Sequence, residues 1–581
     1  MTAPFAAAAL LDELLGDPWR TDNVYGFDAG VARDARGDFP HAFAARLDSV
    51  DFPLAYLPPS LGGALRGLDD TLLLVRVAAR RDAVIMPATL LSCSAVLTVL
   101  AAGTPEQAKT VAEWVQEGRT IAFALSEEHS GSDVLAGECR LDPAQDGGFR
   151  LAGRKWLVGR GATADAAVVV ARTAARGPAA FTAVLLGPRE LSRIRRQPAQ
   201  PVTGMRGIDF ADLAFDGTPV PQAAVIGGPG GGLAGAMRAQ QVVRLLSTAA
   251  CLATADTALR TALRFMQSRR TGGVRVADTA YGSRELAVAA AELFAADLLS
   301  LTAARYAHLS PATFGLCSSV VKRAATRLTA STVSRSRSLL GARGVLAHGP
   351  GAVVDKAQRD NAIVESIDTS PFGVLRAVAL QLPGYAAAFA ETSAVGLDTL
   401  FTFGAPLPDL DPAALDLSAR PRDLVLLGFA AHAEELARDL TARGEERAAG
   451  LVHDVRTGLA DTFATAAEAQ RDRSRGLGAS AELLDLADRC CLLYAAAAAA
   501  LAWHAQPDRG LYGEGPAGAG WLTAVLAVLL ATAEGRDPRQ AASDLPPAAR
   551  AVTSLDAARL LFTAFPVQLS DGPAPEEDET T

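Results

Sequence analysis

The chain has 581 residues, of which half are hydrophobic and a fifth are charged. This length exceeds one ordinary hydrophobic core, so we expect two to four domains in a soluble, densely packed globular protein. A formal net charge of −9 argues against a general nucleic-acid binder. The six cysteines include no C-x-x-C pair, and they indicate neither a metal site nor a disulfide framework.

The first 120 residues predict a helical domain. The N-terminus is apolar, but no Lys or Arg precedes its apolar centre and Asp12 and Glu13 follow at once, which favours an amphipathic helix over a secretory signal. Residues 104–107 have the spacing of a helix capping box. The longest uncharged apolar stretches, near residues 85–103 and 492–503, carry polar interruptions or end too soon for a membrane span. We therefore expect no membrane span and a cytoplasmic protein.

The rest of the chain divides into further zones of composition. Short apolar runs bounded by Gly, Pro and Asp predict a small β domain over residues 121–230. Long helical patterns rich in alanine predict a helical bundle over residues 231–395. A Pro-rich joint at 403–412 precedes an additional alanine-rich helical domain at 413–570. We expect the acidic tail at 571–581 to be disordered.

Three segments in the β zone carry the most specific signal. Their sequences are Ala124-Leu-Ser-Glu-Glu-His-Ser-Gly-Ser-Asp-Val134, Gly153-Arg-Lys-Trp156 and Ala164-Asp-Ala-Ala-Val-Val-Val-Ala-Arg172. In order and separation they resemble the flavin-binding core of the acyl-CoA dehydrogenase family. The resemblance implies a mainly α fold with a central β domain: an N-terminal helical domain, a β-barrel-like middle domain and a four-helix bundle. The additional C-terminal helices resemble the extension of acyl-CoA oxidases.

The resemblance also implies bound FAD. Ser126 keeps a hydroxyl where the family has threonine, and Val158 stands where a threonine contacts the flavin. Arg269 or Arg270 is expected to reach the cofactor pyrophosphate of a neighbouring subunit, which implies a homodimer. The full set of implied cofactor-binding residues is Ser126, Ser132, Trp156, Val158, Arg269, Arg270, Gly341 and Ser370.

The family's usual catalytic base is a glutamate that follows an Arg-Asp pair. At that spacing from Arg359-Asp360, Asp368 takes the place of the base, and Glu365 is the reserve candidate. Aspartate is one methylene shorter than glutamate, which sets its carboxylate back by about an ångström and can cost about a hundredfold in rate. Some members place the base before an arginine on the first bundle helix. Here Val243, which cannot act as a base, precedes Arg244, so the base cannot lie at that position. Arg244 is taken as a substrate-binding residue.

Asp368 also has a purely structural interpretation. The sequence Asp368-Thr-Ser-Pro371 has the polar-then-proline pattern that begins a helix, with Asp368 as the N-cap. Both interpretations stay open at this stage, and one residue could serve both roles.

We therefore expect an FAD-dependent enzyme that introduces a double bond between the α and β carbons of an acyl thioester. The thioester would be carried by CoA or by an acyl carrier protein, and the electron acceptor would be an electron-transfer flavoprotein or oxygen. Two alternatives remain: a flavin monooxygenase or oxidase on the same fold, and a catalytically silent scaffold subunit. The three possibilities differ in two properties: whether the protein binds flavin, and whether a saturated thioester reduces that flavin.

Overall fold

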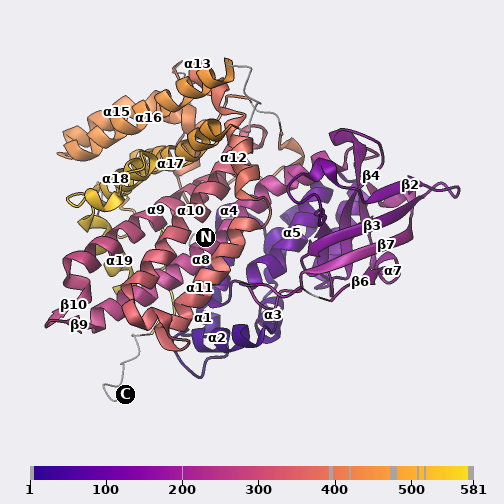
Figure 1. The fold of residues 1–581 in the computed structure, drawn as a ribbon, viewed down its shortest axis with the longest axis horizontal. Coiled ribbons are helices and arrows are strands. Elements are labelled where there is room, and N and C mark those ends of the chain that lie inside the picture. Colours follow the sequence, from indigo (N-terminus) through magenta and orange to yellow (C-terminus); the bar gives the residue numbers. More distant parts are fainter. Residues whose placement is uncertain are drawn as a thin grey trace.

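Long helices form most of the molecule, and a β-sheet lies at one end (Figure 1). This is a computed structural model, and it describes residues 5–198, 200–390, 397–417, 420–471, 480–506, 509–515 and 518–572. The N-terminal helices are α1 (Ala6–Leu15), α2 (Phe27–Arg36), α3 (His41–Asp48), α4 (Leu68–Arg81), α5 (Ile85–Ala102) and α6 (Pro105–Gln116). The predicted capping box is confirmed, because Thr104 and Gln107 exchange side-chain to backbone hydrogen bonds at the start of α6.

The β domain is one sheet of eight strands. The strand order is β6-β7-β3-β2-β4-β5-β8, and β1 pairs in parallel with β4 outside this path. The parallel pairing of β1 with β4 begins at Ile121 and Ala166. The strands are β1 (Ile121–Ala124), β2 (Arg140–Pro143), β3 (Phe149–Val158), β4 (Ala166–Arg172), β5 (Phe181–Leu186), β6 (Arg195–Arg196), β7 (Ala211–Val220) and β8 (Val225–Ile226).

The bundle consists of long helices with almost fully buried sequences. Their alanine-rich composition lets neighbouring backbones approach closely, and α8 and α9 have hardly any solvent-facing stripe. α4 and α5 of the N-terminal region pack on α8, which is the central helix. The bundle helices are α8 (Gly232–Ser268), α9 (Ala280–Leu309), α10 (Gly315–Leu339) and α11 (Gly349–Ser366).

The added helices cover one side of this bundle. α17 packs on α9, α10 and α12, while α18 and α19 pack on α9, so one hydrophobic core runs through the N-terminal helices, the bundle and the extension. In Figure 1 the extension forms the orange and yellow layer beside the bundle, opposite the sheet. α12 (Pro371–Ala379) directly follows the bundle helix α11, and the added helices are α15 (Leu424–Ala442), α16 (Glu446–Arg471), α17 (Ala481–His504), α18 (Gly520–Ala533) and α19 (Pro546–Ala557).

Buried charges join the C-terminal segment to the rest of the fold. The guanidinium group of Arg80 on α4 donates to Asp571 (Nη2–Oδ2 3.0 Å) and to Asp256 on α8 (Nε–Oδ1 3.1 Å). None of these three side chains is exposed to solvent. Asp571, which the sequence places at the start of a disordered tail, therefore lies in the core. Residues 573–581 lie outside the described residues.

Four of the described helices, α5, α8, α9 and α17, are long and apolar enough to cross a membrane. In each, between 67% and 100% of the most apolar window is buried within the structure. The chain's own helices and strands therefore cover most of this apolar surface.

Candidate active site

The segments with flavin-binding sequences meet at the edge of the sheet that faces the bundle. Ser126 follows β1, and its backbone carbonyl accepts a hydrogen bond from the backbone N–H of Trp156 near the end of β3, at 2.9 Å. The buried Lys155 holds the following loop, because its Nζ donates to Glu127 Oε1 at 2.6 Å. The Trp156 ring is half-buried, and the side chain of Ser126 is exposed beside it.

A hydrogen bond between two hydroxyl groups links this loop to the bundle. Ser132 Oγ donates to Ser370 Oγ at 2.8 Å, across 238 residues of sequence. Both serines are implied as cofactor contacts by separate stretches of the resemblance, one before the sheet's central strands and one after α11. Their meeting shows that the two stretches occupy a common site.

The other implied cofactor residues are placed differently. Val158 is 2% exposed and lies in the core of the β domain, so only its backbone could contact a cofactor. Arg269 and Arg270 are exposed at the hairpin that follows α8, at the opposite end of the bundle from α12 (Figure 1). Gly341 follows the last turn of α10 and is exposed as well. These three residues do not contact the Ser132–Ser370 site within one chain.

Asp368 lies in the short connection between α11 and α12, and it does not cap α12. The N-cap is Ser370, whose Oγ accepts a hydrogen bond from Gly373 N at 3.3 Å. The interpretation of Asp368 as the cap is therefore wrong by two residues. Asp368 instead adopts the left-handed backbone conformation, with φ of +65°, which is uncommon for a residue other than glycine and is concentrated at functional positions.

The carboxylate of Asp368 lies beside the buried cation Lys322. Its Oδ2 lies 3.6 Å from Lys322 Nζ on α10, and this oxygen is buried and has no hydrogen-bond partner among the described residues. Lys322 Nζ donates to Ser247 Oγ at 3.0 Å and to the carbonyl of Val364 at 2.7 Å. Because no donor among the described residues occupies this oxygen, its lone pairs remain open to a group that enters the site.

Arg244 completes this group of charges from α8. Its Nε donates to Thr369 Oγ1 at 2.9 Å, which fastens the residue after Asp368. Burial lowers the pKa of Arg244 to about 10, and the negative charge of Asp368 offsets part of this effect. Burial also lowers the pKa of Lys322, again partly offset by Asp368. The negative charge of Asp368 thus stabilises the positive charges of the buried Lys322 and the half-buried Arg244.

The structure separates Glu365 from this group. Its Oε1 pairs with Arg323 Nη1 at 3.1 Å, and Arg323 also donates to Asp488 on α17 at 2.7 Å. Glu365 thus links α11 and α10 to the extension and does not face Lys322.

Lys322 is the residue of the site that sequence reasoning missed. The chain contains only four lysines among 55 basic residues, and three of the four, Lys155, Lys322 and Lys356, are buried. This chain uses arginine for nearly all its positive charge. A lysine within an alanine-rich bundle helix was therefore the sequence feature that could have indicated a site residue.

The Arg-Asp pair that located Asp368 is itself structural. Arg359 Nη2 donates to Asp34 on α2 at 2.7 Å, and Lys356 Nζ donates to the buried Asp360 at 2.6 Å. A hydrogen bond from the backbone N–H of Met205 also reaches Asp360. These contacts hold α11 against the N-terminal helices and the β domain. They therefore fix the position of the connection after α11, which contains Asp368.

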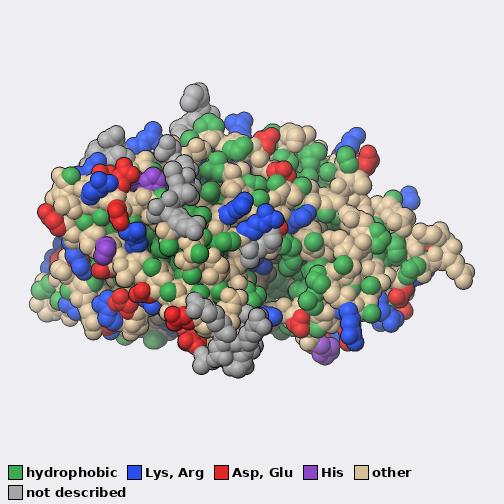
Figure 2. Space-filling model, turned by 90° about the horizontal axis from the view of Figure 1, so that it is seen from above, with side chains coloured by type: hydrophobic (Ala, Val, Ile, Leu, Met, Phe, Trp, Pro, Cys, Tyr) green, Lys and Arg blue, Asp and Glu red, His purple; other side chains and the backbone are tan. Residues whose placement is uncertain are grey.

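The donor set fits a flavin cofactor. Exposed hydroxyls at Ser126 and Ser132, the half-buried Trp156 ring and the Ser370 hydroxyl supply donors and an aromatic wall. Viewed from above, the surface between the bundle and the β domain is hollowed, and hydrophobic side chains line the hollow (Figure 2). These residues would hold the flavin ring near Asp368, and the flavin would supply the hydride acceptor.

Comparisons with known proteins agree with this geometry. Residues 122–218 match the acyl-CoA dehydrogenase middle domain, and residues 230–367 match the acyl-CoA dehydrogenase C-terminal domain. The mitochondrial 2-methylacyl-CoA dehydrogenase of Solanum tuberosum is 33% identical over 25% of this chain, but the match spans only 36% of that relative. The acyl-CoA dehydrogenase FadE25 of Mycobacterium bovis is 23% identical over 57% of this chain and 85% of its own length.

A solved structure shows the same fold. The prolyl acyl carrier protein oxidase AnaB superposes with a TM-score of 0.55 and 17% identity, over 64% of this chain and 96% of its own. The fold and the matched domains define a flavin-dependent oxidoreductase that acts on CH–CH donors. The two matched segments are the middle and C-terminal domains of the acyl-CoA dehydrogenase family, whose cofactor is FAD. The helices from α15 to α19 lie outside both matched segments.

Proposed function

We propose that this protein catalyses FAD-dependent α,β-dehydrogenation of an acyl thioester, with Asp368 as the base. The observation that carries the proposal is the Asp368 carboxylate oxygen, which is buried, lacks a hydrogen-bond donor and lies 3.6 Å from Lys322. Its left-handed backbone places it beside Ser370, the same residue that would touch the flavin. The short connection between α11 and α12 would thus hold both the base and the cofactor.

The reaction removes two hydrogens from the substrate. Asp368 would take the α-proton, and the electron pair of that C–H bond would form the new C=C bond; a flavin held by Ser126, Ser132, Trp156 and Ser370 would supply the acceptor for the β-hydride. Lys322, which is held by Ser247 and Val364, would orient the Asp368 carboxylate toward the α-carbon. Arg244 would support it by holding the neighbouring Thr369. The products would be a trans-2-enoyl thioester, a protonated base and two electrons on the flavin, for which an electron-transfer flavoprotein or oxygen would be the final acceptor.

We propose an acyl carrier protein as the bearer of the thioester, with CoA as the alternative. AnaB, which shares this fold, is described as a prolyl acyl carrier protein oxidase. Asp368 in place of glutamate and the altered loop at Ser126 also resemble members that act on tethered substrates in specialised biosynthesis. We further propose a homodimer, because Arg269, Arg270 and Gly341 can serve a cofactor only if it is held by another copy.

The absorption spectrum of the purified protein with FAD tests this proposal. Anaerobic addition of saturated acyl thioesters on CoA and on carrier proteins should bleach the flavin, and the thioester that bleaches it fastest identifies the carrier. Bound flavin that no saturated thioester bleaches, but that supports hydroxylation of another substrate, would favour a monooxygenase. A protein that stays colourless with added FAD would be a scaffold and would refute the proposal.

Lys322→Met should slow flavin reduction by about a hundredfold, while the binding of the thioester changes little. Methionine fills a similar volume but leaves the Asp368 carboxylate without the charge that orients it, and misplaced catalytic groups lose rate on this scale. Stopped-flow measurement of flavin reduction at several thioester concentrations separates the two effects.

The matched control for this variant is Arg323→Met, at the next position of α10. Its side chain pairs with Glu365 and Asp488, so flavin reduction should keep its rate. An equal loss in the two variants would mean that Lys322 acts only through general stability.

A further inference from the structure

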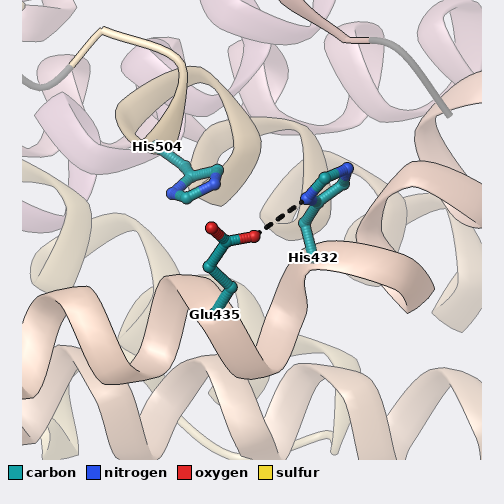
Figure 3. A group of neighbouring side chains, drawn as sticks. All are labelled: His432, Glu435 and His504. Atoms are coloured by element: carbon teal, nitrogen blue, oxygen red, sulfur yellow. Dashed lines mark hydrogen bonds and ion pairs between the residues drawn. The ribbon is translucent and has the colours of Figure 1, made fainter. Parts of the chain in front are cut away.

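Three metal-ligating side chains converge on the added helices. His432 and Glu435 lie on α15, and His504 is the last residue of α17. One ligand atom from each lies within 4.8 Å of those of the other two. Figure 3 shows the carboxylate of Glu435 between the two imidazole rings.

The local hydrogen bonds orient these groups toward one another. His432 Nδ1 lies 3.4 Å from Glu435 Oε2, and the two imidazole rings are 5.9 Å apart between centroids. His504 Nδ1 lies 3.4 Å from the carboxylate of Asp439, one turn further along α15. A carboxylate on one nitrogen fixes the orientation of an imidazole and increases the basicity of the other nitrogen, as beside bound zinc.

The composition of the chain makes this meeting unusual. The sequence has only seven histidines, and two of them, 72 positions apart, meet where α15 packs on α17. The side chains of His432 and His504 are 28% and 20% exposed, so an ion could reach them from solvent. Within the described parts of the chain, this is the group of His, Cys, Asp and Glu side chains that satisfies the spacing of a metal site.

The geometry points to a binding site for one divalent transition-metal ion of the zinc class, with His432, Glu435 and His504 as its ligands and Asp439 as the positioning carboxylate. Zinc takes nitrogen and oxygen ligands at about 2.0–2.2 Å in a tetrahedron, so neighbouring ligand atoms lie about 3.3 Å apart. The observed spacing requires the side chains to close by less than about 1.5 Å, which rotation about χ angles on the surface allows. The ion joins α15 to the last turn of α17 and leaves one coordination position for water.

Titration of the full-length, flavin-loaded protein with Zn²⁺ tests the site. Calorimetry should give one ion per chain, and metal analysis after dialysis should retain it. His432→Ala and His504→Ala should each weaken binding by at least tenfold, and Asp439→Asn by about tenfold. Zinc should also raise the midpoint of thermal unfolding by a few degrees in the wild type but not in the histidine variants. Co²⁺ should give tetrahedral ligand-field bands at wavelengths longer than the flavin absorption.

The matched control is His453→Ala on α16. This imidazole is also exposed and also faces α15, beside Glu434 and Ala437, and its loss should leave zinc binding unchanged. Flavin content and circular dichroism establish that each variant folds. Less than one ion per chain, or equal affinity in the wild type and His504→Ala, would overturn the site. If His453→Ala weakened zinc binding as much as the other histidine variants do, the binding would be nonspecific and the proposed site would be wrong.

Discussion

Asp368→Asn should slow reduction of the flavin by an acyl thioester about a thousandfold, because an amide cannot take the α-proton and a general base contributes roughly 10²–10⁴ in rate. The substitution keeps the shape of the side chain. It also keeps the backbone, since asparagine tolerates the left-handed conformation seen at this position (φ +65°). Anaerobic stopped-flow absorbance measures the rate directly.

Glu365→Gln is the matched control for this experiment. It removes the charge of the reserve base three residues earlier, where the carboxylate pairs with Arg323. This variant should bind FAD and be reduced at nearly the wild-type rate. Should Glu365→Gln lose the rate while Asp368→Asn keeps it, the base would have to be reassigned. If neither variant slows reduction, the proposed proton abstraction at this turn is wrong.

Asp571→Ala should lower the free energy of unfolding by about 3–5 kcal/mol. The change leaves Arg80 buried without one of its carboxylates, and breaking a buried ion pair from one side has a cost of this size. Denaturant unfolding followed by circular dichroism measures the change. Asp22→Ala is the control, because its pair with Arg20 is 68% and 65% exposed and an exposed pair contributes little to stability.

The effect of pH separates the charge of Asp571 from its packing. Burial raises the pKa of this carboxyl, but Arg80 and Arg260 outweigh burial and hold its pKa far below the ordinary value. The stabilisation is therefore fully present above about pH 4, the ordinary range of aspartate, and is lost as the pH falls further. The difference between the wild type and Asp571→Ala should shrink in acid. A difference that stays constant with pH would mean that only packing is lost.

Truncation gives a second test of the same contact. A chain that ends at Gly572 keeps Asp571 and should be more stable than a chain that ends at Ser570, which loses it. Similar stability of the two shortened chains would contradict the role of Asp571.

Local sequence was enough to predict the elements but not every contact. Helical periodicity and the capping box at Thr104 predicted the N-terminal and bundle helices, because these signals depend on residues three or four apart. The shared site of Ser132 and Ser370 followed only from the family resemblance, since no local rule relates residues 238 positions apart.

The failures also have physical causes. The N-cap of α12 shifted from Asp368 to Ser370 because both residues offer an oxygen before the proline, and backbone geometry decides between them. Lys322 was not recognised as a site residue, because helical periodicity does not show which face of α10 packs against α8 and α11. Asp571 was assigned to the tail by the acidic run that follows it, because composition does not reveal arginines buried almost 500 residues earlier.

The C-terminal segment bears on how the protein is made. On the ribosome α1 and α4 emerge early, and Arg81 can pair with Asp12 at once. The bonds from Arg80 to Asp571 and from the backbone N–H of Ser570 to Asp12 can form only when nearly the whole chain has been made. Nascent domains generally fold in order from the N-terminus, but here the network of charges on α1 and α4 is completed only by residues translated nearly 500 positions later. A stalled or prematurely released chain would expose these charges and become a substrate for chaperones and proteases.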